Sequence, residues 1–177
     1  MKPLRIILES KAPPRVRFKE VCASFLGAFI GIGLIGVISM FFFDSRGMPL
    51  IIPPFGASAV LLFGAYKSPF SQPRHVIGGH LISALSGVIA YLIFEGTLWL
   101  ATGFGVALAI ALMHLSRTLH PPGGATTLVY ILGGAKFHQL GFLYLLFPVG
   151  IGIFILTFSA VIVNKFLLKR PYPEYWW

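Results

Sequence analysis

Two short stretches of the sequence decide the fold: PPFGASAVL at residues 53–61 and PPGGATTLV at residues 121–129. Each opens with a proline pair, which a helix tolerates only in its first turn. The apolar runs that contain them, 49–66 and 121–134, are too short to cross a bilayer as helices. We therefore expect two half-length helices, each preceded by extended chain.

Longer apolar stretches surround these two. Of the 177 residues, 56% are hydrophobic and 11% are charged, so a water-facing shell for a soluble domain is excluded. A membrane-spanning helix needs about 20 apolar residues. Stretches of that length predict four full transmembrane helices at 21–43, 76–94, 97–118 and 140–163. The fold class is an all-α polytopic membrane protein.

The two short stretches are alike, and they predict an internal repeat. Their first prolines stand at positions 53 and 121, an offset of 68 residues. The same offset brings the second long stretch, 76–94, onto the fourth, 140–163. We expect two halves, 21–95 and 96–165, each built as full helix, half-helix, full helix. Interrupted helices at matching places in two halves are typical of transporters; chance similarity over nine residues is the alternative.

Basic residues set the topology. The net charge is +9, and cations concentrate in the segment 1–20, which we expect on the cytoplasmic side against anionic lipid rather than on nucleic acid. The apolar run behind it is typical of an anchor, not a cleaved signal. If both short stretches cross the membrane, twelve cations lie inside and two outside, Arg46 and Lys136. The positive-inside rule favours this arrangement over re-entrant dips.

Six crossings have three consequences. Both termini face the cytoplasm of a multi-pass inner-membrane protein. The second half is inverted relative to the first, so the two halves form an inverted repeat. The tail 166–177, which carries Tyr172, Tyr175, Trp176 and Trp177, is expected to lie at the interface.

An inverted repeat would bring the two half-helix N-termini in from opposite faces towards one point near the midplane. Each N-terminus carries about half a positive charge and up to four unmatched N–H donors, which together make an anion site. Gly56, Gly123 and Gly124 leave room for a ligand, and hydroxyls follow in both stretches. Small residues and hydroxyls also serve helix packing and capping, which is the alternative interpretation.

Three motifs resemble the HPP family of integral membrane proteins. They are HPPGGAT at 120–126, PFGASAVLL at 54–62 and QPRHVIGGH at 72–80. The family commonly has Asn after the Pro-Arg pair, where this chain has His75, so no role is carried over to that position. Some members in chloroplasts and cyanobacteria are implicated in nitrite transport. Some bacterial members carry C-terminal CBS domains; nucleotide regulation through such a pair is not expected here.

The resemblance implies a pathway for a small inorganic anion, nitrite being the best candidate. Taken residue by residue, it implies a substrate path along Pro53, Pro54, Phe55, Gly56, Ala57, Ser58, His120, Pro121, Pro122, Gly123, Gly124, Ala125, Thr126 and Thr127. Arg74 and His80 are secondary candidates. Arg74 is placed to attract anions or simply to set topology, and His80 lies inside a membrane segment, where ionisable groups are often functional.

The residues favour no enzyme and no cofactor. No pair of histidines shares a helix face at metal-ligand spacing, there is one cysteine, and no phosphate-binding loop occurs. Small residues recur at Ala23, Gly27 and Gly31 and at Gly79, Ser83 and Gly87. They favour close helix contacts, either within the chain or in a homo-oligomer, for which we expect a dimer. The functional prediction is a small-anion permease; the alternative is a non-transporting scaffold or sensor.

Overall fold

The computed structural model describes residues 15–43 and 50–177, so the predicted cations Lys2, Arg5, Lys11 and Arg46 lie outside the described residues. Within those ranges the chain is all-α, as predicted, with no strand. The elements run in the order α2 (Phe18–Phe42), α3 (Pro53–Ala59), η2 (Val60–Gly64), η3 (Pro69–Ser71), α4 (Pro73–Ile93), α5 (Leu98–Leu115), α6 (Pro122–Leu132), α7 (Ala135–His138), η4 (Leu145–Gly150), α8 (Ile151–Ile162) and η5 (Val163–Leu167).

Four helices in the described chain are long and apolar enough to span a membrane, which confirms the four predicted spans. They are Phe18–Phe42, Pro73–Ile93, Leu98–Leu115 and Leu145–Leu167. The last begins five residues later than the predicted 140. Phe147 there is extended, with φ −137° and ψ 129°, ahead of Pro148. Proline disfavours helical backbone in the residue before it, so this span is kinked at Phe147 and its regular α-helix, α8, begins at Ile151.

Both proline pairs start short helices, as predicted. Ile52 is extended, with φ −123° and ψ 148°, and α3 with η2 then continues to Gly64. The chain before α6 has no regular structure from Thr118 to His120. α6 ends at Leu132. Neither helix reaches the length that a full crossing requires.

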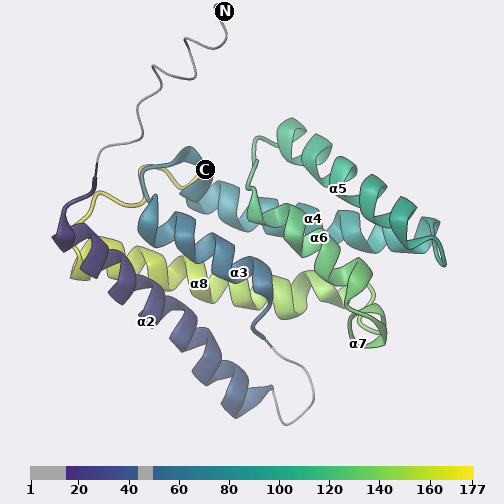
Figure 1. Cartoon of the computed structure of the whole chain (residues 1–177), viewed down its shortest axis with the longest axis horizontal. Coiled ribbons are helices and arrows are strands. Elements are labelled where there is room, and N and C mark those ends of the chain that lie inside the picture. The colour runs from purple at the N-terminus through teal and green to yellow at the C-terminus, as the bar shows by residue number, and fades with distance from the viewer. Residues whose placement is uncertain (1–14, 44–49) are drawn as a thin grey trace, which may run out of the picture.

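The two halves are arranged as an inverted repeat (Figure 1). α2 packs against α8, and α5 packs against α4, so the first helix of each half contacts the third helix of the other. α3 and α6 lie side by side between these pairs and run in opposite directions. Each element of the second half therefore runs opposite to its counterpart in the first.

One end of the bundle gathers the start of α2, the start of α4, the end of α5 and the C-terminal tail. Arg170 in the tail forms an ion pair with Glu20 of α2, with 2.6 Å between Nη2 and Oε2. Arg74 of α4 donates to the carbonyls of Ser116 and Arg117 at 2.8 and 3.1 Å. Both short helices therefore cross the bundle instead of turning back.

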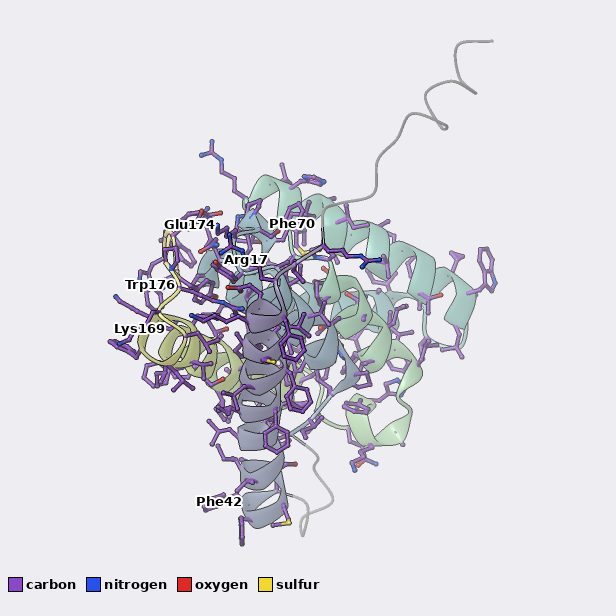
Figure 2. All side chains as sticks on the ribbon, turned by 60° about the vertical axis from the view of Figure 1, so that its left-hand side comes forward. Arg17, Phe42, Phe70, Lys169, Glu174 and Trp176 are labelled. Carbon is purple, nitrogen blue, oxygen red and sulfur yellow. The ribbon has the colours of Figure 1, made fainter. Side chains whose placement is uncertain are left out.

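Charge is distributed unevenly between the two ends. Figure 2 shows Arg17, Lys169 and Glu174 at one end and Phe42 at the other. Among the described cations, Lys136 in α7 lies at the end opposite the tail. The rest lie at the tail end: Arg15, Arg17, Lys19, Lys67, Arg74, Arg117, Lys165, Lys169 and Arg170.

The small-residue stripes make contacts within the chain. A side chain at Gly27 or Gly31 would meet the ring of Phe63, which fills the space beside α2. On α4, Gly79 contacts His120 and Gly87 contacts the backbone of Thr127. The glycines of these stripes therefore bring η2 close to α2 and α6 close to α4.

Candidate functional site

Four buried polar side chains meet where α3, α4 and α6 come together, and we call them the polar centre: Ser58, His80, His120 and Thr126. Ser58 comes from α3, His80 from α4 and Thr126 from α6, while His120 lies in the irregular chain just before α6. Each has 0% of its surface exposed. Ionisable side chains at such depth in a membrane bundle are rare and mark functional sites.

Local sequence explains why these side chains point inwards. In α3 the larger residue, Phe55, shares the buried face with Ser58, and Gly56 and Ala57 face outwards. The ring of Phe55 packs edge-on against the ring of His80, with centroids 5.5 Å apart. His120 can approach α4 because Gly79 has no side chain there; a Cβ on Gly79 would overlap with the Cβ of His120.

A continuous chain of hydrogen bonds joins the polar centre. Ser58 Oγ lies 2.7 Å from His80 Nε2 and 2.9 Å from His120 Nε2, so one hydroxyl links both rings. His80 Nδ1 lies 2.7 Å from Thr126 Oγ1. His120 Nδ1 lies 2.8 Å from the carbonyl oxygen of Phe70. The two imidazole centroids are 5.0 Å apart.

The direction of each hydrogen bond follows from the groups at the ends. The carbonyl of Phe70 can only accept, so His120 carries its proton on Nδ1, and its Nε2 accepts when the ring is neutral. Ser58 therefore donates to His120 and accepts from His80 Nε2–H. His80 Nδ1 then accepts from the Thr126 hydroxyl. For neutral rings this pattern places one proton on every bond and fixes both tautomers.

Further hydrogen bonds hold the backbone around the centre. Thr127 Oγ1 donates to the carbonyl of Ser83 at 2.8 Å, and the Tyr144 hydroxyl donates to the carbonyl of Thr126 at 2.9 Å. These bonds tie α6 to α4 and to the turn before η4. The backbone of α6 beside the polar centre is therefore fixed both to α4 and to the turn before η4.

The predicted pathway residues divide between two faces of the short helices. Ser58, His120 and Thr126 enter the polar centre together with the secondary candidate His80. The other buried ones pack within the bundle: Pro54, Phe55, Pro122, Gly123 and Thr127. Gly124 is half-buried. The remaining ones are exposed on the outer face: Pro53, Gly56, Ala57, Pro121 and Ala125.

The expected meeting of the two half-helix N-termini is corrected by the structure. An apolar groove of about 430 Å³ is lined by Pro53 at the start of α3 and by Leu132 at the end of α6. Ser58, further along α3, contacts His120 at the start of α6. The two N-termini therefore lie at opposite ends of an antiparallel pair, because the helices overlap along their sides instead of meeting end to end.

The expected free N–H donors are also fewer than predicted. Proline supplies none at the first helical positions. The N–H of Phe55 donates to Ile52, at 3.0 Å, and those of Gly123 and Gly124 donate to His120 and Pro121, at 2.9 and 3.2 Å. A side chain at Gly123 would meet Ser83 Oγ. The space beside Gly123 is thus filled by α4, whereas among the described residues no atom of another segment lies within 4 Å of the position that a Cβ on Gly56 would take. Side chains carry the polarity of the site.

Arg74 lies outside the polar centre. Besides bonding the end of α5, its guanidinium stacks over the ring of Trp177 at 5.0 Å. It therefore joins α4, α5 and the tail at one end of the bundle. The described residues contain no cluster of three metal-ligating side chains.

The pairing of His80 with His120 was missed by sequence reasoning, which compared histidines only by their spacing along the chain. The two are brought together by the packing of α4 against α6, and no local pattern encodes that contact. The sequence did indicate one member of the pair, because His80 lies inside a predicted membrane helix.

Comparison with known proteins places this architecture in a family. The profile of the HPP transmembrane region matches residues 13–173. This chain belongs to the HPP family. Two relatives in Dictyostelium discoideum, both named only as transmembrane proteins, are similar to it: one is 38% identical and covers 94% of this chain, and the other is 37% identical and covers 96%. No solved structure matches significantly.

The HPP chain spans little more than half of the length of these relatives, 54% of the first and 60% of the second. All four residues of the polar centre lie inside the matched region. The similarity therefore extends over the whole membrane bundle.

Proposed function

We propose that this HPP protein is a membrane permease for a small monovalent anion, with nitrite as the best candidate, and that the anion binds at the polar centre. One observation carries the proposal. Hydroxyl and imidazole groups from both halves of an inverted repeat meet, fully buried, where the two interrupted helices touch. Inverted repeats with interrupted helices at the repeat interface are the usual construction of transporter binding sites.

The charge of the site favours an anion. The polar centre offers hydroxyl and imidazole donors, and the described acidic residues, Glu20, Glu95 and Glu174, stand at helix ends or in the tail. Cations concentrated at one end of the bundle would attract anions to that end. Nitrite is small and flat, and its two oxygens accept hydrogen bonds of the kind that Ser58 and Thr126 now make with the imidazoles.

Binding requires the two short helices to separate, because the four side chains now bond to one another. Rocking of one repeat against the other around a fixed site is the common form of alternating access. α6 packs against α4 and α5, whereas α3 packs against α6, α2 and α8, so such a movement has to break the contact between α3 and α6. We place the protein in the inner membrane, with the cationic end and both termini in the cytoplasm, and expect a homodimer.

A non-transporting scaffold or sensor is the second candidate. The observation in its favour is that each side-chain nitrogen and oxygen of the polar centre has a partner inside the chain. A satisfied polar network can specify packing without binding anything. Transport measurements separate the two functions.

The test is nitrite flux into vesicles reconstituted with the purified protein, against protein-free vesicles. We expect flux above background for the native protein and for His114→Gln, whose side chain is exposed at the end of α5. His80→Gln should reduce it, provided that its melting temperature shows a folded protein. Absence of flux for nitrite, nitrate, formate, bicarbonate and chloride alike would overturn the proposal.

A further inference from the structure

We infer that the ion coupled to anion movement is a proton, and that it binds to the imidazole pair of His80 and His120 linked by Ser58. The inference rests on the proposed function and adds that a proton gradient drives the transport of the anion. Three features of the polar centre support it: the direction of its hydrogen bonds, the burial of both rings and the composition of their surroundings.

The first feature is that Ser58 has one hydroxyl proton and two ring partners. In the resting pattern Ser58 donates to His120 Nε2 and accepts from His80 Nε2–H. A proton arriving from water forms a new N–H bond at His120 Nε2, where only the hydrogen bond from Ser58 is lost. Ser58 Oγ then accepts from both rings, and its own proton needs another acceptor. An oxygen of a bound anion can supply that acceptor.

The second feature is the cost of the added charge. Both rings are fully buried, and an unpaired positive charge inside a membrane protein is expensive. No carboxylate forms a hydrogen bond or ion pair with either ring among the described residues. A bound monoanion would then neutralise the imidazolium. Each ligand therefore favours the other, and this linkage is reciprocal.

The third feature is the set of neighbours that titrate. From the first turn of α4, the Nδ1 of His75 bonds with the carbonyl of Leu119 at 2.8 Å, next to His120. Before η4, Tyr144 donates to the carbonyl of Thr126. From α3 the neighbour is the uncharged ring of Phe55, and α5 contributes Met113 beside Ser83. The two imidazoles that bond to Ser58 are therefore the groups of the polar centre that can accept a proton, and because they are buried without a counter-charge in the described part of the chain they are expected to do so together with an anion.

The resting pattern can be tested without any transport. Nitrogen-15 NMR of histidine-labelled protein in lipid at alkaline pH should show His120 protonated on Nδ1 and His80 on Nε2. His80→Gln and His120→Gln assign the two signals. Opposite tautomers would overturn the inference, because Ser58 could not then link the rings as described, and they would leave the proposed permease standing.

The coupling itself is tested by the driving force for nitrite uptake into reconstituted vesicles, with protein-free vesicles as the background for nitrous acid diffusion. A proton moving with each nitrite makes transport electroneutral. Uptake by the native protein and by His114→Gln should follow an imposed pH gradient and ignore a potassium–valinomycin potential. His120→Gln, which keeps hydrogen-bonding groups but binds no proton, should lose the response to pH.

Two outcomes separate the inference from the proposed function. Uptake driven by the membrane potential, with no response to pH, would overturn proton coupling and leave an anion permease. Absence of protein-dependent uptake would remove both. Nitrite affinity provides a further check, since it should increase on acidification by roughly 5- to 150-fold, the usual range for linked sites.

Discussion

Ser58 matters most among single residues, because its one hydroxyl serves two imidazole rings. The sequence identified Ser58 and Thr126 as hydroxyl donors because each follows a proline pair within a few residues along the chain. Their partners could not be predicted in the same way. His80 and Ser58 are 22 positions apart, and His120 and Ser58 are 62 apart, so the contacts depend on how three helices pack.

Ser58→Ala should lower the free energy of unfolding by about 1–3 kcal/mol, because it leaves one buried ring donor and one ring acceptor without a partner. Ser86→Ala is the matched control. Ser86 is also buried, but its hydroxyl bonds only to the carbonyl of Ile82 in its own helix, so its loss should cost less than about 0.5 kcal/mol. Unfolding in lipid nanodiscs measures both; equal losses would contradict the assigned role of Ser58.

Thr157 offers a prediction of the opposite sign. Its hydroxyl is buried in α8 and has no hydrogen-bond partner among the described residues. Thr157→Val keeps the shape of the side chain and removes the unsatisfied group, so the protein should become more stable by about 1 kcal/mol. The same unfolding measurement checks it, and a loss of stability would show that the hydroxyl has a partner after all.

At the scale of elements, the two proline pairs predicted where the short helices begin, because proline is favoured only in the first turn. Their relative placement could not be predicted from the same residues. It depends on the depth at which each extended segment enters the bundle. For α3 that depth is set by the N–H of Leu50, which donates to Ser39 Oγ on α2 at 2.9 Å. Before α6 it is set by His120 against Gly79.

Gly79→Ala should therefore displace the chain before α6. The added Cβ would overlap with His120 Cβ and would lie 2.9 Å from the carbonyl oxygen of Thr118, which is backbone and cannot rotate away. We expect a loss of about 1–3 kcal/mol in unfolding free energy. Gly103→Ala on α5, with nothing within 4 Å, should be neutral or stabilising by up to about 1 kcal/mol. Equal effects would refute the tight contact.

At the scale of the whole molecule, composition and loop charge were enough to predict an all-α bundle with six crossings. The described structure confirms the all-α bundle, with four helices long and apolar enough to span a membrane and the shorter helices α3 and α6 between them. The overlap of α3 with α6 could not be predicted, because the repeat offset and the charges of the loops indicate only that the two halves are inverted. They say nothing of whether the short helices meet by their ends or by their sides.

Labelling of single cysteines tests the orientation of the bundle. Cys22 is the one cysteine of the chain and is replaced by serine first. Lys136→Cys, in α7, should react in intact cells with a maleimide that cannot cross membranes. Lys67→Cys, exposed after η2 at the cationic end, should react only after permeabilisation. The reverse pattern would mean that the cationic end faces outwards.

The most direct test of the account is a nitrite titration of the histidine-labelled protein in lipid, followed by nitrogen-15 NMR. If a small anion binds where the halves meet, the signals of His80 and His120 will shift and saturate while that of the exposed His114 stays in place. If the His80 and His120 signals stay unchanged as nitrite is raised, or if all three drift together without saturating, the buried centre does not bind this anion.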